Sequence, residues 1–430
     1  MIWRRVVSVS AILVAIANVA QGQTSTPALG PTDLVQIAIQ RNREFLAVKQ
    51  RIAETQGLLR QAGLRPASAL EIGESTGRLL GTRGEQEFSA GYFHTVETFG
   101  KRTKRIAVAQ KSSEVAEAEI AEQTRLLSYE VKVRYADVIT EQQKLDTVQR
   151  LLSVNREYYR LTDARVQQGD AAPIEGQLFL TDLSRTEAQQ VVLADRADRA
   201  LLELRKVVGV PPSEPLSLHD GALPVLNNVS MSELQEQALR SRPDLRILHL
   251  LEEQTLAEVN LARAEGKPDV TVSARYSRSN SAFDQLGLNR SGELTPLRDR
   301  DNILTFGLAI PILQPKRNQG AIEAALARST AAQLRREHLE AVVRLDVEVA
   351  LRRWEAANRT LEILNRGVIG QSEKNLVVVR EAYSLGQLRI LDVLNEQRRL
   401  IETQLTYLDA QSELFQSFAE LERAVGGSIQ

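Results

Sequence analysis

The histidines and carboxylates of this 430-residue chain are the side chains with the widest chemistry, because they can move protons or hold metal ions. The four histidines lie far apart, at His94, His219, His249 and His338. His338 has Glu337 and Glu340 beside it, but adjacent positions on a helix point in different directions. We therefore expect each histidine to be a structural or surface residue, and we predict no metal site.

The chain also lacks the motifs that usually carry catalysis or cofactor binding. It has no Walker phosphate loop, no dinucleotide-binding glycine pattern and no His-Glu-x-x-His motif. It has no cysteine, which excludes disulfides, thiolate metal sites and a lipidated N-terminal cysteine. The 54 Lys and Arg against 55 Asp and Glu leave no basic excess for nucleic acid. We expect no enzyme, no cofactor and no nucleic-acid partner.

Residues 1–22 have the layout of a secretory signal peptide. Arg4 and Arg5 precede an apolar stretch over 6–20, and the small residues Ala20 and Gly22 follow. The apolar stretch is shorter than the ~20 residues that a membrane-spanning helix needs, which favours cleavage over an anchor. No later stretch approaches 18 uninterrupted apolar residues. The mature chain is therefore predicted to be exported, and to cross a membrane, if it does, without hydrophobic helices.

The mature sequence contains two similar copies, with a period just over 200 residues. Matching positions keep the same order in both copies: Leu34 with Leu234, Pro66 with Pro268, Gly91 with Gly307, Gly169 with Gly386, and Gly209 with Gly426. This common order predicts an internal duplication. We assign the first copy to residues 23–209, a linker to 210–231 and the second copy to 232–427.

Each copy contains a segment in which apolar and polar residues alternate. The second copy shows it most clearly, with Val270, Val272, Ala274 and Tyr276 on one face, and later Leu304, Phe306, Leu308 and Ile310. We predict strand pairs over 68–96 and 269–312, the latter enclosing a polar segment over 277–302. A membrane barrel needs strands with one apolar and one polar face. Half-buried hairpins in a soluble domain show the same alternation, so the pattern alone favours neither.

Very long helices follow each strand pair. We predict helices over 102–168 and 318–383, each followed by a return helix, over 174–207 and 388–425. Apolar residues recur at seven-residue steps in both copies: Val131, Val138, Leu145 and Leu152, then Val347, Trp354, Leu361 and Val368. Such a seam predicts long helices packed side by side with gentle supercoiling. The turns at Gly169 and Gly386 make each unit a helical hairpin instead of a rod.

This arrangement resembles the TolC family of outer-membrane efflux proteins over nearly the whole mature chain. The best local matches are the second tip, 386–395, and the segment Thr98-Phe99-Gly100-Lys101-Arg102 with Arg105. The second segment is most similar to the branch that serves heavy-metal cation exporters. The resemblance implies a mainly α fold with a membrane β-barrel portion: a homotrimer with a helical barrel and a shared 12-stranded β-barrel.

The resemblance also implies partners and gate residues. The partners are outer-membrane lipid, a periplasmic adaptor (membrane fusion protein) and an inner-membrane pump of the RND type. Asp392 matches an aspartate that faces the bore near the periplasmic constriction, whereas Asn395 stands where some members have a second acid. Arg389 would either bond across subunits or remain a solvated surface arginine. The tip-turn residues Gly169, Asp170, Gly386 and Gln387 would contact the adaptor.

We expect the chain to be a passive exit duct in the outer membrane, anchored by its barrel without lipidation and most suited to divalent heavy-metal cations. One alternative keeps the duct but changes its cargo to drugs, other small organic molecules or proteins of type I secretion. Another alternative, from a different class, is a soluble periplasmic coiled-coil scaffold whose hairpins only cap it.

Overall fold

The computed structural model describes residues 28–77, 79, 84–219, 221, 223–226, 230–312 and 318–429. The predicted signal peptide, 1–22, lies outside the described residues. The first copy contains α1 (Pro31–Arg41), α2 (Arg43–Ala62), β1 (Ala69–Thr76), β2 (Gln86–Val96), α3 (Lys101–Gln168) and α4 (Pro173–Val208). The second contains α5 (Met231–Ser241), α6 (Pro243–Glu265), β3 (Val270–Leu288), β4 (Leu294–Ala309), α7 (Gln319–Ile363), η2 (Leu364–Val368), α8 (Ile369–Ser384) and α9 (Ile390–Val425).

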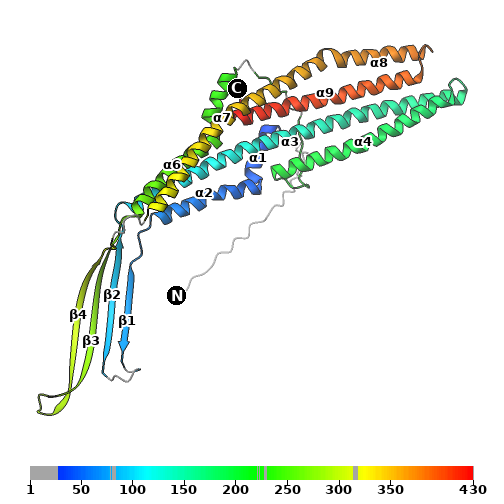
Figure 1. Ribbon diagram of the computed structural model, residues 1–430. Helices are drawn as coiled ribbons and strands as arrows, with labels where there is room; N and C mark the ends of the chain where they lie inside the picture. Colours follow the sequence, from blue (N-terminus) through cyan, green and yellow to red (C-terminus); the bar gives the residue numbers. More distant parts are fainter. Residues whose placement is uncertain are drawn as a thin grey trace, which may run out of the picture.

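The molecule is long and has two distinct ends (Figure 1). The four strands form one sheet that extends from one end of the helices. The two long helical hairpins, α3 with α4 and α8 with α9, run side by side toward the opposite end. Their turns therefore lie together, far from the sheet.

Each copy opens with two helices, α1 and α2 in the first copy and α5 and α6 in the second. In the first copy the break falls at Asn42, whose side chain accepts a hydrogen bond from the Phe45 backbone N–H and so caps α2. In the second copy α6 begins with Pro243, which cannot donate to the preceding turn. Both helix starts therefore have local causes that hydrophobic periodicity does not report.

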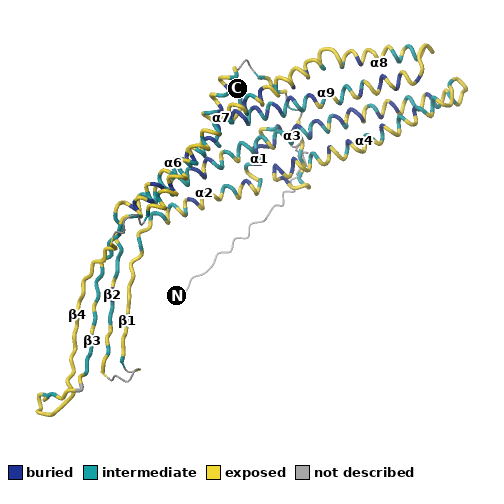
Figure 2. Tube along the Cα trace, viewed as in Figure 1, coloured by how far each residue is buried: buried dark blue, intermediate teal, exposed yellow. Residues whose placement is uncertain are grey.

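The core runs as a narrow seam along the helices (Figure 2). Val131, Val138 and Leu152 of α3 are buried, as are Val347 and Leu361 of α7. Most remaining positions on these helices are partly or fully exposed, as expected where helices form a single layer. Short helices add a thicker core near the middle, where Leu34 and Leu234 are fully buried in equivalent clusters.

The second long helix is not continuous, which corrects the predicted helix over 318–383. A single π-helical turn, η2, separates α7 from α8, and the Ile369 N–H bonds to the Leu364 carbonyl five residues back. Val368, which continues the seven-residue series, is exposed by 38% at this turn. Beyond it the buried positions are Ser372 and Leu376. The π turn adds one residue to the helix and shifts the seam by one position.

The sheet is antiparallel with strand order β1-β2-β3-β4. The pairing of β2 with β3 ends at Gln86 and Asn280, whereas β3 and β4 continue to Leu288 and Leu294. The second hairpin therefore projects beyond the first (Figure 1). The segment 277–302 was predicted to be a polar chain between two strands, but most of it belongs to β3 and β4. Strands pair through backbone hydrogen bonds, which do not require apolar side chains.

None of the helices in the described residues is long and apolar enough to cross a membrane.

Candidate functional site

One face of the sheet is apolar. Directly paired residues in an antiparallel sheet point to the same side, so the register sorts every strand position by face. Ile72, Ala90, Tyr276 and Leu304 occupy one level of this face, and Leu70, Tyr92, Ala274 and Phe306 the next. The large members are exposed, with Phe306 exposed by 76%. An exposed apolar sheet face of this extent is suited to contact with lipid chains.

The opposite face of the same sheet is polar. It carries Ser89, Gly91, Ser273, Ser277 and Thr305, among other small residues. Arg275 on this face pairs with Glu71 at 3.1 Å, and its guanidinium lies over the Phe93 ring. The two faces therefore differ as the lipid-facing and water-facing sides of a membrane strand differ.

Carboxylates gather at the far end of the polar face. Glu87 of β2 pairs with Ser279, which pairs with Asp301 of β4, so both acids lie at one level. Asp299 lies on the same face one step further out. Among the described residues none of these three carboxylates forms an ion pair, in contrast to Glu71. This end of the polar face is therefore strongly negative.

The segment Thr98–Arg102 with Arg105 forms the junction between sheet and helices. Phe99 and Gly100 have φ of 54° and 68°, which turns the chain sharply into α3. The Lys101 ammonium is buried and bonds to Asp269 at 2.8 Å, just before β3, while Arg105 binds Glu97. These contacts give the segment a structural role at the place where both hairpins enter the helices.

The two hairpin turns are alike in backbone conformation. Gly169 and Gly386 have φ of 84° and 73°, a region that glycine adopts without strain, and both are exposed. Asp170 and Gln387 follow them and are also exposed. The structure thus places all four predicted tip residues at the same end of the molecule (Figure 1).

The predicted gate residues lie in the first turns of α9. The Arg389 N–H donates to Asp392 Oδ2 at 2.9 Å, so Asp392 caps the start of its own helix. Arg389, Asp392 and Asn395 are all exposed, whereas their neighbours Val393 and Leu394 are buried. The three predicted residues therefore share an accessible surface near the tip.

A contact between the two tips was missed from the sequence. The Tyr383 hydroxyl at the end of α8 donates to Glu175 Oε2 at 2.7 Å, in the first turn of α4. Burial, and then the bond to Glu175, raise the pKa of Tyr383 to about 12. Glu175 lies 217 positions before Asp392, the same separation as between Gly169 and Gly386. The duplication therefore makes Glu175 the equivalent of Asp392 in the first copy.

A buried polar cluster joins the hairpins behind this contact. Gln397 of α9 donates to Asn155 Oδ1 at 2.5 Å, and Asn155 donates to Asp182 and Thr186 of α4 at 3.2 and 3.4 Å. Asn155 is 1% exposed. The Asn155 side chain therefore links α3, α4 and α9. Removing it would leave the buried Gln397 amide without this hydrogen-bond partner, which would lower the stability of the fold.

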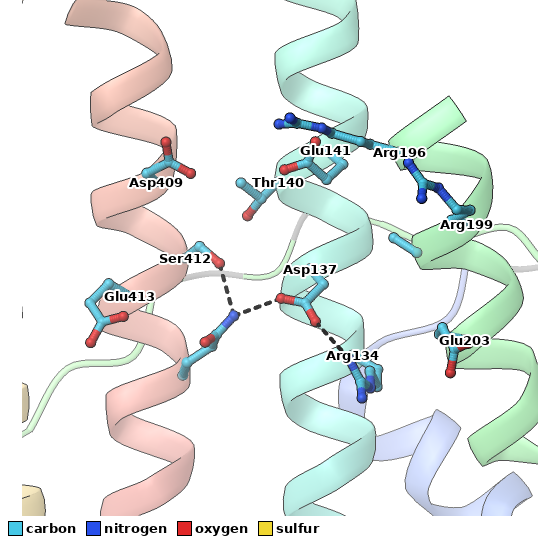
Figure 3. A pocket seen from close by; sticks show the side chains of 12 residues that line it. Arg134, Asp137, Thr140, Glu141, Arg196, Arg199, Glu203, Asp409, Ser412 and Glu413 are labelled. Atoms are coloured by element: carbon cyan, nitrogen blue, oxygen red, sulfur yellow. Dashed lines mark hydrogen bonds and ion pairs between the residues drawn. The ribbon is translucent and has the colours of Figure 1, made fainter. Parts of the chain in front are cut away.

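A groove with a volume of about 550 Å³ lies between α3, α4 and α9 (Figure 3). Asp137 projects into it and bonds to Arg134 and Gln416, while burial raises the pKa of its carboxyl. Other charges are also paired, such as Lys144 with Asp409 at 2.5 Å. The described lining of the groove therefore contains ion pairs and hydrogen bonds that join α3 to α9.

Within the described residues no group of three or more His, Asp or Glu is arranged to hold a metal ion. The features that stand out are the two-faced sheet, the long helical hairpins and the linked tips. Together they define a class of protein, the subunit of a long channel that combines membrane strands with a helical conduit.

Comparison with known proteins agrees with this class. The model of the family described as "Outer membrane efflux protein" matches residues 34–210 and again 234–427, once in each copy. The chain therefore belongs to the outer membrane efflux protein family. Proteins of this family are passive channels in the outer membrane with a periplasmic helical portion, and they are not enzymes. Family membership confirms the resemblance and the fold class, and it sets aside the soluble scaffold.

Individual relatives are distant. The cobalt-zinc-cadmium resistance protein CzcC of Cupriavidus metallidurans is 23% identical over 96% of this chain and 95% of its own. The pyoverdine export outer membrane protein OpmQ of Pseudomonas putida is 22% identical over 92% and 86%. Among solved structures, CusC has a TM-score of 0.75 at 18% identity, over 93% of this chain and 92% of its own. The open state of MtrE from Neisseria gonorrhoeae has a TM-score of 0.70 at 19% identity, over 93% and 89%.

Proposed function

We propose that three copies of this chain assemble into one duct whose subunits each contribute four strands to a shared 12-stranded barrel. The observation that carries this proposal is the two-faced sheet with β1 and β4 at its edges. Within the described residues neither strand has a partner on its outer side, and unpaired backbone groups are costly in lipid. Closing three sheets into one barrel, with the polar faces inside, pairs the backbone groups of every edge strand. Residues 1–22 would be cleaved on export, and the mature chain would carry no lipid.

The helical tips are the proposed periplasmic entrance. The Tyr383–Glu175 bond ties the two hairpins of one subunit together and favours a closed entrance. Exposed Asp392, with Asn395 and Arg389 nearby, would face the bore, and threefold symmetry would turn one carboxylate into a ring that attracts cations. Gly169, Asp170, Gly386 and Gln387 would contact a periplasmic adaptor, which connects the duct to an RND-type pump in the inner membrane.

The proposed cargo is divalent heavy-metal cations. The acidic end of the polar sheet face, with Glu87, Asp299 and Asp301, favours cations at the exit of the duct. The relative named for cobalt, zinc and cadmium resistance supports this choice. A relative named for pyoverdine export supports the second candidate, in which the same duct carries small organic molecules.

Growth of a deletion strain separates the two cargo classes. We expect loss of the gene to lower tolerance to zinc, cobalt or cadmium by at least twofold, and a plasmid copy to restore it. A drug panel measured in parallel should remain unchanged. New drug or siderophore-export defects with normal metal tolerance would replace the metal cargo with an organic one.

Ion selectivity in planar bilayers tests the acidic exit. Replacing Glu87, Asp299 and Asp301 with their amides should lower the cation-to-anion permeability ratio severalfold. Glu74→Gln is the matched control, because Glu74 pairs with Phe88 and lies on the apolar face. An equal effect of both changes would show that overall charge, and not charge within the bore, sets the selectivity.

A further inference from the structure

On the second hairpin the continuous apolar part of the sheet face ends at Tyr276 and Leu304, and large apolar side chains return on this face only near the turn, at Leu286, Leu288 and Leu294. Exposed apolar side chains recur at alternate positions from Leu304 to Ile312, and these eight residue steps span about 26 Å at the ~3.3 Å per residue of extended chain. This matches the ~25 Å apolar band of outer-membrane barrels. At the end farthest from the helices the Tyr276 hydroxyl donates to Asn302 Oδ1 at 2.7 Å. A tyrosine with a polar partner at this position is typical of a membrane interface.

Three arginines follow directly beyond this tyrosine on the same face. Arg278 pairs with Asn302, Arg300 with Asn280, and Arg298 with Ala282, which places their side chains on the side that carries Tyr276 and Leu304. All three side chains are exposed. Among the described residues their guanidinium groups form no ion pair and no hydrogen bond.

The sequence Arg298-Asp299-Arg300-Asp301 explains why these charges remain uncompensated. Alternation along β4 turns both aspartates to the polar face and both arginines to the apolar face. Arg278 and Arg300 are diagonal neighbours at about 7–8 Å, and like charges at that distance repel. A carboxylate on the same face at this level is Glu74 of β1, which β2 separates from Arg278 and which β2 and β3 together separate from Arg298 and Arg300. An external anion would stabilise this cluster.

We propose that Arg278, Arg298 and Arg300 bind the phosphate groups of lipid headgroups in the leaflet that faces the cell exterior. The proposal rests on the barrel described above, because the barrel sets the depth of the cluster. The cluster begins one level beyond the interfacial tyrosine and extends away from the helices, which places it at headgroup height. Arginine presents a planar fork that binds phosphate through two hydrogen bonds, and its aliphatic stem can remain against lipid.

A lipid-binding measurement tests this site in the assembled protein. Detergent-solubilised trimers are titrated with a fluorescent phosphorylated glycolipid and with its dephosphorylated analogue, at low and high salt. Each basic residue near an anionic lipid surface contributes about 1 kcal/mol, so replacing all three arginines with glutamine should weaken binding on the order of 100-fold. The Lys variant at all three positions should retain most of the affinity, and high salt should weaken binding to the wild type.

Controls separate lipid phosphate from other partners. Asp299→Asn with Asp301→Asn changes the same strand on the opposite face and should leave lipid binding unchanged. Full competition by millimolar inorganic phosphate would show a free-anion site and overturn the proposal. An equal loss in Glu74→Gln would show an ion pair between neighbouring copies and also overturn it. Bilayer conductance of the glutamine variant should equal that of wild type, whereas loss of conductance would count against the barrel itself.

Discussion

The two long helical hairpins of this chain carry the same seam but differ by one residue. Val131 and Val347 are 216 positions apart, whereas Gly169 and Gly386 are 217 apart. The extra residue is accommodated in η2, where the second helix has Gly367 and Gly370 and the first has Leu151 and Val154. The long helix of the first hairpin, α3, is thus continuous. The long helix of the second hairpin is interrupted by the π turn η2, which separates α7 from α8 near the tip.

The tips show what this difference produces. Beyond η2 the seam consists of Ser372 and Leu376, and Tyr383 reaches Glu175 of the other hairpin. The counterpart of Glu175 is Asp392, which caps its own helix. Duplication therefore supplied two similar acids, and a one-residue shift gave them different partners.

Insertion of one alanine after Gly367 should exceed what the single π turn can absorb. The helix beyond it would rotate by about 100°, which takes Leu376 out of the buried seam and Tyr383 away from Glu175. We expect a loss of about 4–5 kcal/mol in unfolding free energy and a permanently open entrance. Thermal unfolding of the purified assembly and single-channel conductance measure both effects. Gly367→Ala keeps the residue count, so a similar defect in that variant would exclude register as the cause.

Asn155→Ala should destabilise the protein by about 1–3 kcal/mol, because Gln397 loses its buried partner. The corresponding position after the shift is Ser372, whose side chain has no hydrogen bond among the described residues. Ser372→Ala should therefore change stability by less than about 0.5 kcal/mol. Denaturant unfolding compares the two variants directly, and equal effects would contradict the asymmetry of the hairpins.

Tyr383→Phe should weaken the closed entrance by about 1–2 kcal/mol and increase the time that the channel is open. The raised pKa of Tyr383 adds a pH test. The hydroxyl must remain protonated to donate, so its contribution is constant below the ordinary value of 10.0 and is lost as the pH rises toward about 12. The Phe variant should lack this loss. An identical alkaline profile in both proteins would remove Tyr383 from the gate.

Gly367→Ala and Gly370→Ala should each stabilise the second helix by about 0.5–1 kcal/mol. A Cβ at either position meets no other atom within 4 Å, and alanine restricts the unfolded chain more than glycine. Leu151→Gly in α3 should have the opposite sign. Circular dichroism melts measure these small shifts, and destabilisation by both alanines would mean that the π turn requires glycine.

The features recovered from the sequence were those that repeat. The duplication, the seam and the tip glycines follow from spacing alone. The π turn did not, because a one-residue shift is too small to separate from the scatter of apolar positions around Val368. The Tyr383–Glu175 bond joins residues 208 positions apart, so no local pattern reports it. The outer parts of β3 and β4 were missed because charged side chains on both faces resemble a loop.

The sheet order also affects how the protein reaches its membrane. β1 and β4 belong to different copies of the repeat and form the two margins of one sheet. In lipid, a single subunit would expose the unpaired backbone groups of its edge strands, and in water it would expose the apolar face of its sheet. A single subunit is therefore unfavourable in both environments. Membrane insertion and trimer assembly are then expected to be coupled. A monomer that has not yet assembled would be a substrate for chaperones or proteases.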